Sequence, residues 1–429
     1  MDIHHLPAYE LANKIKNKEI SSLELTQHFI DRIEKYDGKI NAVVVRTFED
    51  ALEAAKKADD AISKKDSLGP LHGIPMTIKE SYNIQGQCTT WGIPDYKGNI
   101  AKEDGLAVKR LKKAGAHFLG KTNVPMNLAD FQSYNDIYGI TGNPWDLKKT
   151  PGGSSGGSAA ALAAGFCSLE AGSDIGGSIR NPAHYCGVFG HKPSHGIIPS
   201  SGHELIPKVP EPDLSVCGPL ARSAKDLEIA LDVMAGPMER RSKGWQLNLA
   251  ECNKTSLKDF KVAIWSNDEL APVSKEIAQR CEEVGNKLNS VGTTVSFAAK
   301  PEHDFMKAEI NYQLLLQSVM QSGLPEDEYQ KIEELASSLD KNDFSVDTIL
   351  AKGTVLSHRN WLRQNYAREQ IKISWSKFFE EWDVLICPQL ATTAIEHDHK
   401  KISERTVMVD NQEQRYFQQI FWPGLAVNS

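Results

Sequence analysis

The stretch TPGGSSGGSAAALAAGF, residues 150–166, places two glycine pairs around two serines and follows them with a run of alanines. A flexible linker would continue with residues that gain nothing from burial. Residues 159–164 instead form a helix-favouring run of small side chains, which can approach a sheet or another helix closely. The composition therefore predicts a buried helix that is preceded by a glycine–serine turn.

The same stretch does not match the phosphate-binding loops. The Walker pattern ends in Gly-Lys-Ser/Thr, and no lysine follows Gly157. The dinucleotide fingerprint, GxGxxG after a strand, is not met either. The pattern GxSxG begins at both Gly152 and Gly153, but a nucleophile elbow must follow a buried strand directly. The preceding NPWDLKKTP (143–151) is polar and contains two prolines, so the matches do not indicate an elbow.

A second glycine-rich turn, GSDIGGSIRNP (172–182), follows soon after the first. Two such turns can bring two hydroxyls side by side, and glycines before Ser178 can direct backbone N–H groups at an oxyanion. Lys79 ends an alternating stretch that predicts a buried strand, and burial favours the neutral amine that acts as a base. Two structural turns and a salt-bridged lysine explain these residues equally well.

The composition restricts the class of protein. The 429 residues carry a net charge of −7, with 40% hydrophobic and 24% charged residues, as is ordinary for globular proteins. The acidic balance argues against a nucleic-acid partner, since phosphate binding needs a basic surface. Seven scattered cysteines without a CxxC or Cys/His cluster argue against a metal site and indicate reduced thiols. No apolar run has membrane-spanning length and the amino terminus lacks a signal-peptide core, so we expect a cytoplasmic protein without membrane contact.

Helical and strand-like patterns alternate along the whole chain, which predicts an α/β fold with a central sheet. Ser21 and Glu24 have the spacing of a capping box before a helical pattern at residues 25–36, and residues 106–114 form a second helical pattern. Residues 260–265 and 383–387 are expected to be buried strands. Residues 236–258 are polar and irregular, and residues 325–347 are charged enough to form a helical insertion at the surface. Neither shift in composition marks a boundary, so we expect one domain over residues 1–429.

Four ordered blocks of this sequence resemble the amidase signature enzymes. The blocks are LHGIPMTIKE (71–80), GKTNVPMNLADFQSYNDIYGITGNPWD (120–146), the pair GGSSGGSAAALAAG and GSDIGGSIRNPA (152–183), and CGVFGHKPSHGIIP (186–199). The spacing of Ser154 and Ser178 also resembles the family pattern. The resemblance is continuous over about residues 8–235 and fainter to the end.

This resemblance implies an α/β/α sandwich, in which helices surround a central mixed β-sheet, and a Ser–cis-Ser–Lys triad. Ser178 would be the nucleophile that forms the acyl-enzyme. Ser154, held by a cis peptide bond, would bridge it to Lys79, the base. The implied reaction hydrolyses a carboxylic amide to an acid and ammonia or an amine, without a metal or an organic cofactor.

The resemblance also assigns roles around the triad. The backbone N–H groups of Ile175, Gly176, Gly177 and Ser178 would form the oxyanion hole. Leu128 and Ala129 align with a substrate-lining segment of some relatives, and ordinary core packing explains them equally well.

Other residues inside the same blocks are expected to support the structure. Ser155 would hold its turn by hydrogen bonds, and Asp174 and Arg180 would fix the backbone around the nucleophile. His72 and His191 are expected to be structural, because the implied mechanism needs no histidine.

Two features bear on the subgroup of the family. Asn127 occupies a position where many members, notably the glutamyl-tRNA amidotransferase subunits, carry glutamate, and NVPMNLADFQSYN (123–135) looks more like the stand-alone bacterial amidases. The final QIFWPGLAVNS (419–429) resembles the start of the family's last conserved strand segment, so we expect a domain shortened at its carboxyl end.

Three functions follow from the resemblance. We favour a stand-alone amidase that acts on a small-molecule amide as a monomer or homodimer. The second is the amidase component of a tRNA-dependent glutamyl/aspartyl amidotransferase. The third is a catalytically impaired family member, owing to the short carboxyl end.

Overall fold

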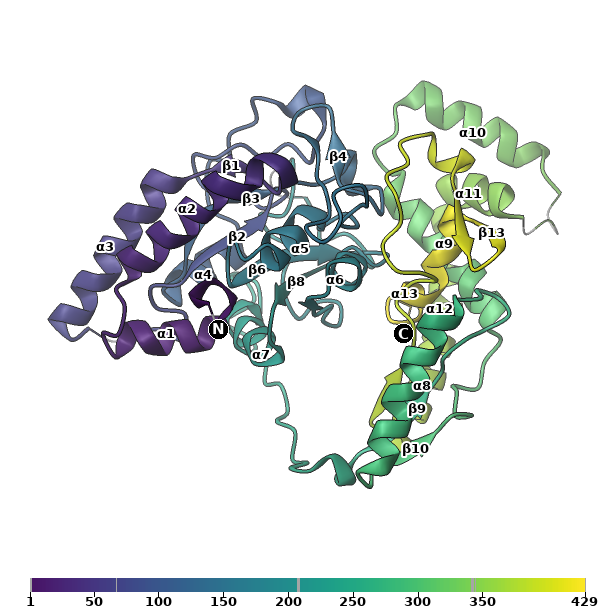
Figure 1. The fold of residues 1–429 in the computed structure, drawn as a ribbon. Helices are drawn as coiled ribbons and strands as arrows, with labels where there is room; N and C mark the ends of the chain where they lie inside the picture. Colours follow the sequence, from purple (N-terminus) through teal and green to yellow (C-terminus); the bar gives the residue numbers. More distant parts are fainter. Residues whose placement is uncertain (1, 67, 207–208, 341–342, 344, 429) are drawn as a thin grey trace. The chain divides into compact units, whose positions relative to one another are not determined.

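The computed structural model describes residues 2–66, 68–206, 209–340, 343 and 345–428. The chain divides into two compact units (Figure 1). Unit 1 comprises Met1–Glu211, Ser215–Leu249 and Ala394–Asp398, and unit 2 comprises Pro212–Leu214, Ala250–Thr393 and His399–Ser429. Two compact units can belong to one domain, so the single domain over residues 1–429 stays a prediction.

Unit 1 holds the elements from the first half of the chain. Its helices are η1 (Ile3–His5), α1 (Ala8–Lys16), α2 (Ser22–Ile40), α3 (Phe48–Lys64), η2 (Pro94–Tyr96), α4 (Leu106–Lys113), η3 (Met126–Leu128), α5 (Gly156–Ala163), α6 (Arg180–Cys186) and α7 (Ala224–Met234). Its strands are β1 (Val43–Arg46), β2 (Pro75–Lys79), β3 (His117–Thr122), β4 (Tyr134–Asn135), β5 (Gly139–Ile140), β6 (Leu169–Asp174), β7 (Phe189–Gly190) and β8 (Val216–Ala221).

Unit 2 is richer in helix. Its helices are η4 (Leu257–Asp259), α8 (Lys275–Ser290), α9 (Phe305–Met320), α10 (Glu326–Ser338), α11 (Val346–Thr354), α12 (His358–Glu381), η5 (Ile402–Glu404), η6 (Tyr416–Ile420) and α13 (Phe421–Leu425). Its strands are β9 (Lys261–Ile264), β10 (Thr294–Ser296), β11 (Val384–Ile386), β12 (Thr406–Val409) and β13 (Gln412–Arg415).

The strands of unit 1 form two three-stranded sheets and a short hairpin. In the order β1-β3-β2, β3 runs antiparallel to β1 and parallel to β2. In the order β6-β8-β7, both pairings are antiparallel. Strands β2 and β6 also lie against each other, which brings the two sheets together, and helices α2, α3 and α5 pack on them. This arrangement of helices on mixed sheets confirms the predicted α/β fold.

Helix α5 is the alanine run of the opening stretch, and residues 156–162 are buried. The two glycines at its start allow close contact with neighbouring backbone. A Cβ at Gly157 would lie 2.3 Å from the Asn123 nitrogen, and one at Gly156 would lie 2.3 Å from Ser133 Oγ. The small side chains therefore let this helix lie directly on β3 and the segment after it.

Local patterns predicted several elements correctly. The Ser21–Glu24 capping box begins α2, β2 ends at Lys79, and α10 is a helix within the charged residues 325–347. One expectation was wrong: β11, predicted as buried, leaves Val384 37% exposed. The reason is that β11 lies at an edge of its sheet and pairs only with β9 among the described strands.

Candidate active site

Strand β2 carries Lys79 into the interior of unit 1. All five residues of this strand are buried, and Lys79, its last residue, has no exposed surface. Its Nζ lies 2.7 Å from Ser154 Oγ and 2.9 Å from Ser173 Oγ, within hydrogen-bond distance of both hydroxyls. The Ser173 carbonyl lies 3.5 Å from the same Nζ. The amine is therefore surrounded by oxygen atoms from the first glycine–serine turn and from β6.

The peptide bond between Gly153 and Ser154 is cis, as the family resemblance implies. Gly153 has no room for a side chain, because a Cβ there would lie 2.4 Å from the Asp130 carbonyl oxygen. Its N–H donates to Asn181 Oδ1 at 2.9 Å, and the Ser155 N–H donates to the Ser178 carbonyl at 3.0 Å. These two bonds join the cis turn to the turn that carries Ser178.

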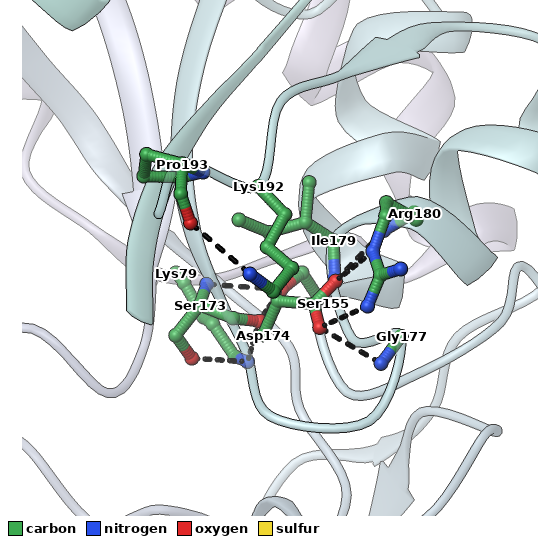
Figure 2. A network of polar contacts seen from close by, with 9 residues as sticks. All are labelled: Lys79, Ser155, Ser173, Asp174, Gly177, Ile179, Arg180, Lys192 and Pro193. Carbon is green, nitrogen blue, oxygen red and sulfur yellow. Dashed lines mark hydrogen bonds and ion pairs between the residues drawn. The ribbon is translucent and has the colours of Figure 1, made fainter. Parts of the chain in front are cut away.

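The Ser178 turn is organised around the carboxylate of Asp174, as Figure 2 shows. The Gly177 N–H donates to Asp174 Oδ1 at 2.8 Å, and the Ile179 N–H donates to Oδ2 at 3.1 Å. Arg180 adds a bidentate contact, with Nη2 2.9 Å from Oδ1 and Nε 3.0 Å from Oδ2. The expected backbone-fixing role of Asp174 and Arg180 is confirmed by these contacts.

The charges near this turn make Asp174 an unusually strong acid. Burial alone would raise its pKa, but the charge and hydrogen bonds of Arg180, with Lys192 and the Gly177 N–H, hold it well below the usual range. Lys192 donates to the Pro193 carbonyl at 3.1 Å, and burial lowers its pKa to about 8, against the attraction of Asp174. The turn is thus fixed by an ionised carboxylate at any ordinary pH.

Burial decides the charge of Lys79, which has no ion pair among the described residues. Desolvation lowers its pKa to about 7, although the acidic groups Asp174, Cys217 and Glu170 act to raise it. A large fraction of this amine is consequently neutral near pH 7. A neutral lysine can accept a proton, which a lysine with an ordinary pKa cannot do at that pH.

The predicted oxyanion-hole groups differ in what they bind. The Gly177 N–H donates its hydrogen bond to Asp174 Oδ1. The N–H groups of Gly176 and Ser178 donate to no other residue in the described part of the chain. Ile175 precedes them in the same turn and is half-buried.

The remaining predicted residues lie around this centre. Ser178 is 6% exposed, and no hydrogen bond joins its hydroxyl to that of Ser154 among the described residues. Leu128 ends η3 and Ala129 follows it, and both are half-buried. The backbone of Asp130, next along the chain, is the group that approaches Gly153. The segment that carries Leu128 and Ala129 therefore approaches the cis turn.

Two residues of the site were not predicted from the sequence. Ser173 contacts Lys79 across the β2–β6 boundary, and Asn181 accepts from Gly153. The only signal for Ser173 was its place between Gly172 and Asp174 in the second glycine-rich turn. Ser155 was expected to support its turn, and its Oγ does so by donating to the Ser173 carbonyl at 3.3 Å.

His72 and His191 form structural contacts, as expected. The His72 ring donates through Nε2 to the Ala58 carbonyl at 2.9 Å, and the His191 backbone N–H donates to the Pro219 carbonyl at 3.0 Å. Over the described residues, no group of three or more His, Cys, Asp or Glu side chains is placed to hold a metal ion. Within that same part of the chain, every helix is too short or too polar to cross a membrane.

The chain was compared with known protein families, sequences and structures. The amidase family model matches residues 24–420. A glutamyl-tRNA(Gln) amidotransferase subunit of Moorella thermoacetica is 35% identical over 71% of this chain and 62% of its own length. Indoleacetamide hydrolase of Bradyrhizobium diazoefficiens is 32% identical over 97% of this chain and 76% of its own. Fatty acid amide hydrolase aligns with a TM-score of 0.78 and 26% identity, over 99% of this chain and 72% of its own.

These relatives carry names of different activities. The match with the Moorella protein spans less than two thirds of that protein's length. Because that relative is named for a reaction on tRNA, the comparisons do not support our exclusion of a nucleic-acid partner. The family itself is clear from the near-complete match and from the shared fold. The chain belongs to the amidase family and is an amidase signature enzyme of the α/β class.

Proposed function

We propose that this enzyme hydrolyses a small carboxylic amide to an acid and ammonia or an amine, through an acyl-enzyme on Ser178. The observation that carries the proposal is the environment of Lys79, a fully buried amine that lies 2.7 Å from Ser154 Oγ. A lysine that only forms a salt bridge would have a carboxylate within 4 Å, and none of the described acidic groups makes such a pair with it.

The hydrogen bonds of Lys79 suit a neutral amine. A neutral amine has two N–H donors and one lone pair, whereas an ammonium has three donors and no acceptor. Nζ has three oxygen neighbours: Ser173 Oγ, the Ser173 carbonyl and Ser154 Oγ. The two oxygens of Ser173 can accept from the two N–H groups. The lone pair then faces the Ser154 hydroxyl, which is the arrangement that a base requires.

The proposed reaction begins with a proton relay. Lys79 takes the proton of Ser154 while Ser154 takes that of Ser178, and the Ser178 oxygen attacks the amide carbonyl. The relay runs backwards to protonate the leaving amine, because an unprotonated amide nitrogen leaves very poorly. Water then repeats the cycle and releases the acid. The proton of Ser178 leaves with the amine, and a proton taken from the water returns to Ser178, so the triad is restored.

The charge on the carbonyl oxygen would be stabilised by backbone N–H groups. Gly176 and Ser178 supply the N–H groups without another partner in the described chain, and Gly177 contributes by holding the turn on Asp174. Removing one donor from an oxyanion hole typically costs about 10²–10³ in kcat. Leu128 and Ala129 are proposed to line the substrate pocket.

A panel of aliphatic, aryl and peptide amides, tested with the purified chain, examines this proposal. We expect hydrolysis of at least one class, and Ser154→Ala should lower kcat by roughly 10²–10⁴, the usual contribution of a positioned proton-transfer group. Ser168→Ala is the matched control, because its hydroxyl is also buried but forms no hydrogen bond in the described chain. Equal activity of the two variants would contradict the relay.

The amidase component of a tRNA-dependent amidotransferase is the second candidate. It is favoured by the 35% identity with the Moorella protein. Size-exclusion chromatography combined with the amide assay separates the two candidates. Activity of the isolated chain, as a monomer or homodimer, supports the stand-alone enzyme, and activity only with added partner subunits supports the second. A folded chain without activity in either case would indicate the catalytically impaired member.

A further inference from the structure

Unit 2 contains a small cavity of about 20 Å³ between α9, α12 and α13. A cavity of this volume has room for one molecule or ion of the size of water. Four aromatic residues form much of the wall: Phe305, Tyr312, Trp375 and Phe421. The polar residues of the wall are His303, Glu309 and Asn428. Their hydrogen bonds decide what the cavity can hold.

His303 presents an acceptor atom. The Ser374 hydroxyl donates to the Glu302 carbonyl at 3.0 Å, so its oxygen can only accept from His303 Nδ1, which lies 3.1 Å away. The ring proton is therefore on Nδ1, and Nε2 carries a lone pair. Nε2 is buried and has no partner among the described residues.

Asn428 also presents an acceptor. The Asn311 amide nitrogen donates to the Gln364 carbonyl at 2.8 Å, so Asn311 Oδ1 is the atom that faces Asn428. Asn428 Nδ2 must then donate to it, at 3.0 Å, and its Oδ1 points elsewhere. Asn428 is 4% exposed, and this Oδ1 has no partner in the described chain.

Glu309 completes the set. Its Oε1 accepts from Gln313 Nε2 at 2.7 Å. Its Oε2 would lie 3.7 Å from a Cβ placed on Gly424, which is another residue of the cavity wall. Burial raises the pKa of this carboxyl to about 7, although the hydrogen bond from Gln313 acts to lower it. A cation beside the carboxylate would offset the free-energy cost of ionising it.

We propose that this cavity is a binding site for an ammonium ion. His303 Nε2, Asn428 Oδ1 and Glu309 Oε2 supply three hydrogen-bond acceptors, and Glu309 supplies the compensating charge. Ammonium has the size of a water molecule and donates four hydrogen bonds, whereas water donates only two. Cation–π attraction to the aromatic side chains of the wall would also favour a cation over a neutral molecule. An imidazole nitrogen as ligand favours ammonium over sodium or potassium, which prefer oxygen.

The site is separate from the proposed reaction centre in sequence and in structure. All the residues that form it belong to unit 2, whereas Lys79, Ser154 and Ser178 belong to unit 1. The proposal therefore does not rest on the amidase reaction, and the binding experiment below needs no substrate.

The test measures the unfolding temperature of the full chain in ammonium chloride, potassium chloride and sodium chloride at equal ionic strength. A ligand that binds only the folded state stabilises it in proportion to the logarithm of its concentration above Kd. We expect ammonium alone to raise Tm by a few degrees with this dependence. Line broadening of ¹⁵N-ammonium by the protein gives a second readout that does not depend on unfolding.

Glu309→Gln keeps the shape of the side chain and removes the charge, so both ammonium effects should disappear. Glu302→Gln is the matched control, because Glu302 is exposed and only its backbone carbonyl contacts this region. An equal Tm increase in all three salts would overturn the proposal, as would ammonium effects that persist in Glu309→Gln. The absence of any ammonium effect would overturn it too.

Discussion

At the residue scale, the chemistry depends on how burial and neighbouring charges set two protonation states. Lys79 has an all-buried environment and no ion pair among the described residues, so its pKa falls to about 7. Asp174 is equally buried, but Arg180 holds its pKa low. The same burial therefore leaves a largely neutral amine near pH 7 at one position and a permanent anion at the other.

The pKa of Lys79 predicts the pH dependence of the reaction. Below its pKa the amine is protonated and cannot act as a base, so kcat/KM should rise about tenfold per pH unit toward pH 7 and then level off. Lys79→Arg should be inactive throughout, because arginine keeps its charge. A wild-type kcat/KM profile that is flat between about pH 6 and pH 8 would contradict the role of Lys79 as the base.

Asp174→Asn should destabilise the protein, because it leaves Arg180 largely buried without its charge partner. Breaking such a pair typically costs about 3–5 kcal/mol in the free energy of unfolding. The folded-state pKa of Asp174 is lowered, so its contribution is present above the unfolded value of 3.8 and is lost as the pH falls below it. Urea unfolding at pH 7 and in acid measures both effects.

The matched control for this change is Asp327→Asn, since Asp327 pairs with Lys331 at the surface, where both side chains are mostly exposed. Exposed pairs contribute little to stability. An equal loss of stability in the two variants would show that the charge of Asp174 does not hold the turn.

At the scale of elements, helix α5 explains why the glycine–serine stretch needs its composition. Its glycines and alanines bring it against β3, so that the turn before it can place Ser154 beside Lys79. Gly157→Ala would put a Cβ 2.3 Å from the Asn123 nitrogen and should cost about 1–3 kcal/mol of unfolding free energy or more.

The control for that substitution is Gly38→Ala in α2. A Cβ at Gly38 meets nothing within 4 Å, so this change should be neutral or stabilising by up to about 1 kcal/mol, as expected for alanine in a helix. Urea unfolding compares the two variants. A Gly157→Ala protein as stable as Gly38→Ala would contradict the close contact of α5 with β3.

At the scale of the whole molecule, the sequence revealed local features better than long-range ones. The strand that ends at Lys79 and the buried alanine helix follow from neighbouring residues, and the triad assignment came from family resemblance. The contact of Ser173 with Lys79 could not be predicted, because it depends on which strand lies beside β2. The two units could not be predicted either, since residues 394–398 join unit 1 from far along the chain.

The central claim is that Ser178 is the acyl-forming nucleophile, and covalent labelling tests it most directly. The purified chain is treated with a serine-directed phosphonate, and peptide mass spectrometry locates the adduct. We predict one adduct on Ser178, loss of labelling and turnover in Ser178→Ala, and much slower labelling in Lys79→Ala. An adduct that persists elsewhere in the site of Ser178→Ala, with turnover retained, would contradict the claim.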